Sequence, residues 1–156
     1  MTRLQISALF IIMWMPYTIG NALLPLLPIY TQKIGADQTN TGIYLGLSFG
    51  ALAIGSLVAG WLSDRFQKRK LTLIIAAIIT FPILFLMGQV NSIELLTIFT
   101  MIVWFTGGLT SATVYILVGI FSEPADRGRN FGVIGIAFGL GAVTGGLIAG
   151  PIVDNW

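Results

Sequence analysis

Five long runs without a single charged residue constrain this chain more than any other feature. Each has between 23 and 29 residues, and they are Leu4–Gln32, Gln38–Ser63, Leu71–Ile93, Leu95–Ser122 and Asn130–Val153. A helix of about 20 apolar residues crosses the hydrocarbon layer of a bilayer. Lipid offers no partner to backbone N–H and C=O groups, so each run is expected to form a helix that satisfies its own backbone.

The predicted fold is therefore all-α, a polytopic transmembrane helix bundle in one domain over residues 1–156. The sequence does not show the short alternating strands that are typical of a membrane β-barrel. The predicted spans cover about 6–30, 42–62, 71–90, 95–121 and 131–153.

Composition narrows the classes of function. Only 9% of the residues are charged, against about 25% in a globular domain, so the lipid bilayer is the expected partner. The chain has no cysteine and no histidine, which excludes disulfides, cysteine metal sites and a histidine proton relay. It also has no phosphate-binding loop ending in Lys-Ser or Lys-Thr. We expect no enzyme, no catalytic residue, no metal, no cofactor and no nucleic-acid partner.

Basic residues fall on alternate loops. Lys33 lies on one side of the predicted membrane, and seven others lie on the opposite side, namely Arg3, Arg65, Lys68, Arg69, Lys70, Arg127 and Arg129. The positive-inside rule places these seven in the cytoplasm. We therefore expect an integral protein of the plasma (inner) membrane, with a cytoplasmic N-terminus and with Trp156 outside.

The stretch "GWLSDRFQKRK", from Gly60 to Lys70, holds five of the fourteen charged residues. Anchoring of the cytoplasmic side explains its lysines and arginines, but not Asp64. A carboxylate at the C-terminal end of a helix faces the negative end of the helix dipole. Asp64 is therefore expected to have a positive partner, either a nearby cation or the N-terminus of another helix.

Glycines recur at steps of four in the second and fifth runs. They are Gly42, Gly46 and Gly50, then the pairs Gly135 and Gly139, Gly141 and Gly145, and Gly146 and Gly150. Small residues at this spacing let helix backbones approach closely in lipid. Two interpretations stay open: fixed packing seams, or seams that slide or rock during a conformational cycle.

The Gly60–Lys70 stretch resembles the signature between the second and third helices of the major facilitator superfamily, roughly G-x-L-x-D-R-x-G-R-R/K. Its places are filled by Gly60, Leu62, Asp64, Arg65, Lys68 and Arg69, and Gln67 stands where the family prefers glycine. The segments "LLPLLPIY", "IGADQTNTGIYLGLSFGALAIGSLVAGWLSDR" and "EPADRGRNFGVIGIAFGLGAVTGG" look like the family's first, second and fifth helices. The resemblance covers nearly the whole chain. It implies the N-terminal part of a transporter, with five of the usual twelve helices, closest to drug-efflux members.

The resemblance also implies roles for the charged residues. In this family the motif aspartate faces a helix N-terminus of the second six-helix bundle and helps to latch the outward-facing shape, a role that falls on Asp64. The motif cations pair with acids near the end of the fourth helix, which makes Glu123 and Asp126 the candidate partners. The alternative is that these are solvated surface charges, whose pairing contributes little.

A glycine motif in the fifth helix of proton-linked exporters also has a counterpart here. It falls on Gly141, Gly145, Gly146 and Gly150, with Gly146 in place of the motif's proline. This match favours export over import only slightly.

Helices one and four line the central cavity of the resembled fold. Their candidate substrate contacts share a helix face at steps of three and four, and they are Trp14, Tyr17, Asn21, Trp104, Gly108, Ser111 and Tyr115. Packing between helices is the alternative interpretation of these residues. No ionisable residue lies deep in any run, although such residues usually mark proton or ion pathways.

The leading hypothesis is a secondary active transporter of a small solute that works by alternating access, with efflux of amphiphilic, drug-like compounds. A carrier for uptake of a sugar or metabolite is the alternative. A truncated or non-transporting membrane scaffold subunit is a hypothesis of another class. Because family members bind substrate between two six-helix halves, we expect transport to need the missing C-terminal helices or a partner chain.

Overall fold

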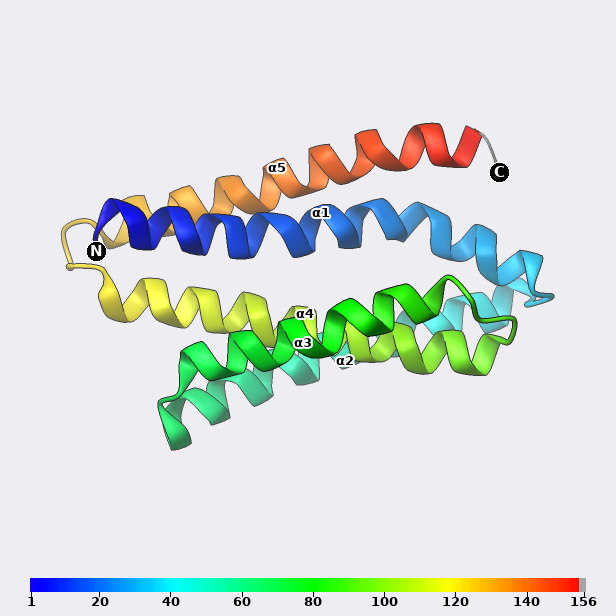
Figure 1. Cartoon of the computed structure of the whole chain (residues 1–156), viewed down its shortest axis with the longest axis horizontal. Coiled ribbons are helices and arrows are strands. Elements are labelled where there is room, and N and C mark those ends of the chain that lie inside the picture. Colours follow the sequence, from blue (N-terminus) through cyan, green and yellow to red (C-terminus); the bar gives the residue numbers. More distant parts are fainter. Residues whose placement is uncertain (155–156) are drawn as a thin grey trace. The chain divides into compact units, whose positions relative to one another are not determined.

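The computed structural model describes the backbone of residues 1–154 and the side chains of residues 1–152. It contains five helices, α1 (Arg3–Lys33), α2 (Gln38–Phe66), α3 (Arg69–Met87), α4 (Ile93–Phe121) and α5 (Arg127–Asp154) (Figure 1). No strand occurs in these 154 residues. All five helices are long and apolar enough to cross a membrane. The prediction of an all-α transmembrane helix bundle is confirmed.

The helix bounds differ from the predicted spans at their ends. All five helices begin before the predicted apolar spans and include polar residues there, because hydrogen bonding along a helix continues past the hydrocarbon layer. In contrast, α3 ends earlier than predicted, at Met87, and Gly88 follows as its C-cap. Trp156, predicted to lie outside the membrane, is not among the described residues.

Contacts group the chain into two compact units. The first unit contains Met1–Ile29 and Val114–Trp156, and the second contains Tyr30–Thr113. In the first unit α1 and α5 run side by side in the same direction (Figure 1). The backbones of Gly141 and Gly145 on α5 lie against α1, and Met13 and Ile134 are buried.

The second unit contains α2, α3 and most of α4. Gly55 on α2 lies against the backbone of Phe105, and Gly108 on α4 lies against the backbone of Leu52. The hydroxyl groups of Thr80 on α3 and Thr106 on α4 are 2.6 Å apart. Glycine contacts and a hydroxyl pair therefore join α4 to both of its neighbours in this unit.

Large apolar side chains cover much of the outer surface. Leu57 is 76% exposed, Phe85 73% and Leu147 72%. A water-soluble protein rarely exposes so much continuous apolar surface. In a bilayer the same side chains face lipid tails, so this surface is that of an integral membrane protein.

Candidate functional site

The turn at Gln67 determines the shape of the predicted latch motif. Gln67 has φ 53 and ψ 10, in the left-handed region, and its N–H donates to the carbonyl of Ser63 at 3.2 Å. It is the one non-glycine residue with positive φ in the part of the chain that the structure describes. Glycine adopts this conformation without steric cost. A glycine at position 67, as in the signature that this stretch resembles, would form this turn without that cost.

The motif's side chains have different surroundings. The Nε–H of Arg69 donates to Oγ of Ser63 at 2.7 Å, and Ser63 is buried on α2. This bond ties the first residue of α3 back to the last turns of α2. Asp64, Arg65 and Lys68, in contrast, are exposed.

Opposite faces of α2 differ in packing. One face is buried and contains Tyr44, Ser48, Gly55 and Ala59 among its members. On the other face, a Cβ atom added at any of four glycines would meet nothing within 4 Å, namely Gly42, Gly46, Gly50 and Gly60. We call these glycines the open α2 face. Asp64 follows Gly60 by four residues and so lies at the end of this face.

The predicted glycine motif of α5 divides between two faces. A Cβ at Gly141 would lie 2.7 Å from Cβ of Tyr17, and a Cβ at Gly145 would meet the backbone of Thr18 and Ala22. These two glycines form a closed seam with α1. A Cβ added at Gly146 or Gly150 would meet nothing within 4 Å, and the same is true of Gly135 and Gly139, which continue the stripe at steps of four and seven. We call these four glycines the open α5 face.

The candidate cavity residues of α1 flank the closed seam. The carbonyl of Trp14, Cβ of Tyr17 and Cβ of Asn21 all contact glycines of α5. The amide Nδ2–H of Asn21 donates to the carbonyl of Tyr17 at 2.8 Å, within the same helix. The indole Nε1–H of Trp14 is buried and has no hydrogen-bond partner among the described residues.

The candidate residues of α4 are more involved in packing. Trp104 is buried and makes an edge-on ring contact with Phe49, with centroids 6.4 Å apart. The backbone of α2 covers Gly108, and Ser111 donates to the carbonyl of Gly108 at 3.2 Å. Tyr115 stacks on Phe131 of α5, with ring centroids 6.0 Å apart. The backbone of α2 therefore occupies the space beside Gly108 that a bound ligand would need.

The acids predicted to pair with the motif cations lie in the connection between α4 and α5. Glu123 and Asp126 are both exposed, and the N–H of Asp126 donates to the carbonyl of Glu123 at 3.0 Å. Nearby, Nδ2 of Asn130 donates to Oγ of Ser122 at 2.8 Å. The pairing of Glu123 and Asp126 with Lys68 and Arg69 stays a prediction.

Sequence reasoning missed the hydroxyl pairs that join neighbouring helices. The hydroxyl oxygens of Tyr44 and Thr100 are 2.8 Å apart, and those of Thr18 and Thr144 are also 2.8 Å apart. Thr113 on α4 is 2% exposed, and its hydroxyl has no partner among the described residues. The available signal was the presence of threonine and tyrosine within charge-free runs, where side-chain hydroxyls often bond across helices.

No group of three His, Cys, Asp or Glu side chains gathers in the described residues to hold a metal ion. The expected absence of a cofactor stays a prediction.

Comparison with known proteins identifies the family. The family model described as Major Facilitator Superfamily matches residues 9–156. A relative in Bacillus subtilis (strain 168), called uncharacterized MFS-type transporter YdeG, is 25% identical over 85% of this chain and 31% of its own length. A Mycobacterium tuberculosis protein called multidrug resistance protein B homolog is 33% identical over 81% of this chain and 21% of its own length.

A second Mycobacterium tuberculosis relative, called uncharacterized MFS-type transporter Rv1877, is 28% identical over 83% of this chain and 19% of its own length. The chain thus spans less than a third of the length of the curated relatives it matches. The family match covers nearly all of the chain and agrees with its membrane-length helices, so this chain belongs to the major facilitator superfamily, a family of membrane transporters.

Proposed function

We propose that this chain works as the N-terminal part of a secondary transporter that exports small amphiphilic solutes by alternating access. The observation that carries the proposal is the presence of two small-residue faces on each of α2 and α5. On each helix, one face is packed and the other is open.

The packed faces account for only some of the glycines. Gly55 holds α2 to α4, and Gly141 and Gly145 hold α5 to α1. Each glycine within a helix costs about 1 kcal/mol of helix propensity relative to alanine. The open α2 face and the open α5 face bring that cost without a close contact inside the described residues. Close packing of a second helical bundle against these two faces would offset the cost in helix propensity.

Alternating access needs such contacts to change. In carriers built from two bundles, one bundle rocks against the other around a fixed site. Where glycines recur on these faces, helices of two bundles can approach closely and shift past each other with little steric cost. Asp64 at the end of the open α2 face is placed to hold one of the two arrangements, through the positive end of a helix in the second bundle.

The proposed solute class rests on the character of the available groups. Trp14 offers an aromatic ring, and no acidic or basic side chain lies deep in the five charge-free runs. Such surroundings suit an apolar solute with a few polar atoms better than a polyol. The name of the M. tuberculosis relative, multidrug resistance protein B homolog, agrees with this class.

The test is efflux from cells that carry the whole native gene for this segment. Cells are loaded with ethidium, an amphiphilic fluorescent cation, then energised, and the initial rate of dye loss is measured. The variant Gly46→Leu with Gly50→Leu fills the open α2 face and should lower the rate about tenfold. The control, Ile74→Leu with Ile78→Leu, changes two exposed apolar residues of α3, outside the open α2 face, and should leave the rate unchanged.

Each outcome selects one hypothesis. An unchanged rate in the glycine variant, at equal amounts of protein in the membrane, contradicts the role of the open α2 face. Inward counterflow of a sugar without dye efflux favours the uptake carrier. Absence of all transport, together with a native product of 16.8 kDa on a blot against the Arg65–Lys70 loop, favours the scaffold subunit.

A further inference from the structure

An exposed aromatic pair lies at the end of α2. The rings of Trp61 and Phe66 meet edge to face, with centroids 5.8 Å apart and planes at 82°. Trp61 is 61% exposed and Phe66 54% exposed. In membrane proteins, aromatic rings at the end of a membrane-spanning helix lie at the level of the lipid headgroups.

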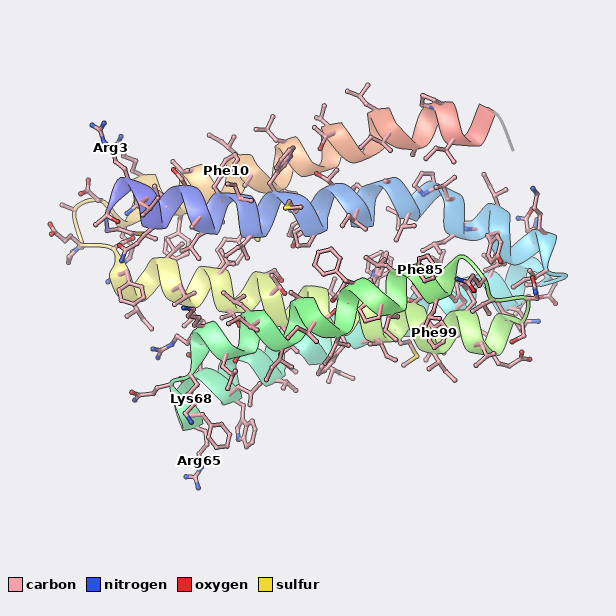
Figure 2. The ribbon with its side chains drawn as sticks, viewed as in Figure 1. Arg3, Phe10, Arg65, Lys68, Phe85 and Phe99 are labelled. Carbon is pink, nitrogen blue, oxygen red and sulfur yellow. The ribbon has the colours of Figure 1, made fainter. Side chains whose placement is uncertain are left out.

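Three cations lie close to this pair along the chain, at the end of α2, in the turn and at the start of α3. Arg65, Lys68 and Lys70 are exposed, and none of their side chains forms a hydrogen bond or ion pair within the described residues. Figure 2 shows the Arg65 side chain extending from the end of α2 away from both helices, with Lys68 on the adjoining turn.

Arg69 differs from its neighbours. It is half-buried, and its Nε–H bonds to Ser63, so its role is to hold α3 to α2. The contrast divides the basic stretch into one structural arginine and three cations that are free to bind a partner.

We propose that Trp61, Arg65, Phe66, Lys68 and Lys70 form a binding surface for the headgroups of anionic phospholipids. We call it the α2–α3 lipid patch. The exposed rings fit the boundary between acyl chains and headgroups, and the cations just beyond them fit the negatively charged phosphate layer. A soluble anion would bind the cations alone, whereas an anionic lipid would contact the cations with its headgroup and the two rings with its acyl chains. The proposal does not depend on transport.

The test measures which lipids contact Trp61. The chain is placed in nanodiscs of phosphatidylcholine that contain a fixed fraction of one lipid brominated near the headgroup, either phosphatidylglycerol or phosphatidylcholine. Bromine quenches tryptophan fluorescence on contact, and the contribution of Trp61 is the difference between the unmodified chain and Trp61→Phe. We expect brominated phosphatidylglycerol to quench Trp61 about two- to threefold more than brominated phosphatidylcholine, because the cations concentrate the anionic lipid.

Charge-matched variants isolate the patch. The triple variant Arg65→Gln, Lys68→Gln and Lys70→Gln should equalise the two lipids. The control variant Arg3→Gln, Arg127→Gln and Arg129→Gln also removes three exposed cations and should keep the excess quenching. Equal quenching in the unmodified chain, or an excess that survives in the patch variant, overturns the proposal.

A salt titration of the unmodified chain tests the same proposal without any substitution. The excess should fall as potassium chloride screens the attraction between headgroup and cation. An excess that is insensitive to salt would overturn the proposal. Loss of the excess on adding inorganic phosphate at constant ionic strength would also overturn it, because the cations would then bind a free anion.

Discussion

The hydroxyl oxygens of Thr18 and Thr144 lie 2.8 Å apart, in the seam where Gly141 and Gly145 bring the backbones of α1 and α5 together. Each hydroxyl also bonds within its own helix, Thr18 to the carbonyl of Trp14 at 3.0 Å and Thr144 to the carbonyl of Leu140 at 2.8 Å. The pair can meet only because the two glycines carry no side chains between the helices. Packing and hydrogen bonding in this seam therefore depend on each other.

The first prediction concerns this hydroxyl pair. Replacing Thr18 and Thr144 by valine, singly and together, should give a coupling of about 0.6 kcal/mol in the free energy of unfolding, as is usual for hydrogen bonds between membrane helices. The measurement is a double-mutant cycle by SDS titration in mixed micelles. Thr97→Val, combined with Thr18→Val, is the control and should give no coupling. The Thr97 hydroxyl bonds to the carbonyl of Ile93 in its own helix. A coupling of zero would mean that the two hydroxyls act independently.

The second prediction compares two adjacent glycines of α5. Gly145→Ala should lower the free energy of unfolding by about 1–3 kcal/mol, because the new methyl group would meet the backbone of α1. Gly146→Ala should leave it unchanged or raise it by up to about 1 kcal/mol, because that position is open and alanine favours a helix. Equal effects at the two positions would contradict the assignment of one closed and one open face.

The five helices could be predicted from the sequence, because a run of about 20 residues without charges is what allows a helix to cross the hydrocarbon layer. The sequence predicted less about which face of each helix packs. In a soluble protein, polar residues mark the outside, but exposed residues of this chain such as Phe85 and Leu147 are as apolar as the core. Glycine spacing indicated where backbones could approach. It did not distinguish Gly145, which packs on α1, from Gly146, which does not.

The candidate site was predicted unevenly for a similar reason. Gly60 to Arg69 could be recognised because the motif is contiguous along the chain. The bond from Arg69 to Ser63 could not, because it depends on how the turn at Gln67 folds α3 back toward α2. The packing of Gly108 against Leu52 depends on the register of two helices distant in sequence, and residue spacing within one helix says nothing of that register.

The third prediction concerns the turn. Gln67→Gly should raise the free energy of unfolding by about 0.5–1 kcal/mol, because relief from the left-handed conformation, worth about 1–2 kcal/mol, exceeds the entropy that glycine adds to the unfolded chain. Lys68→Gly should lower it, because Lys68 has φ −90 and gains nothing from glycine. SDS titration of both variants against the unmodified chain provides the measurement. Destabilisation by Gln67→Gly would show that the glutamine side chain matters more than the backbone strain.

The last prediction concerns the latch and uses the whole transporter. Asp64→Asn keeps the shape of the side chain and removes its charge, so membrane insertion should be unaffected at this exposed position. A carboxylate at the N-terminus of another helix stabilises it by up to about 2 kcal/mol in a partly buried site. Loss of that interaction should change the ratio of the two conformations by a factor of about 5–30 and slow the initial rate of dye efflux to a similar extent.

The matched control for the latch is Asp37→Asn. Asp37 caps the N-terminus of α2 by accepting the N–H of Asn40 at 2.7 Å, and asparagine caps a helix equally well. Both substitutions remove one carboxylate from an end of α2, but only Asp64 follows the open α2 face. Slower efflux in Asp64→Asn with a normal rate in Asp37→Asn supports the latch. A normal rate in Asp64→Asn contradicts it, and in that case the open α2 face rocks without a charge to hold it.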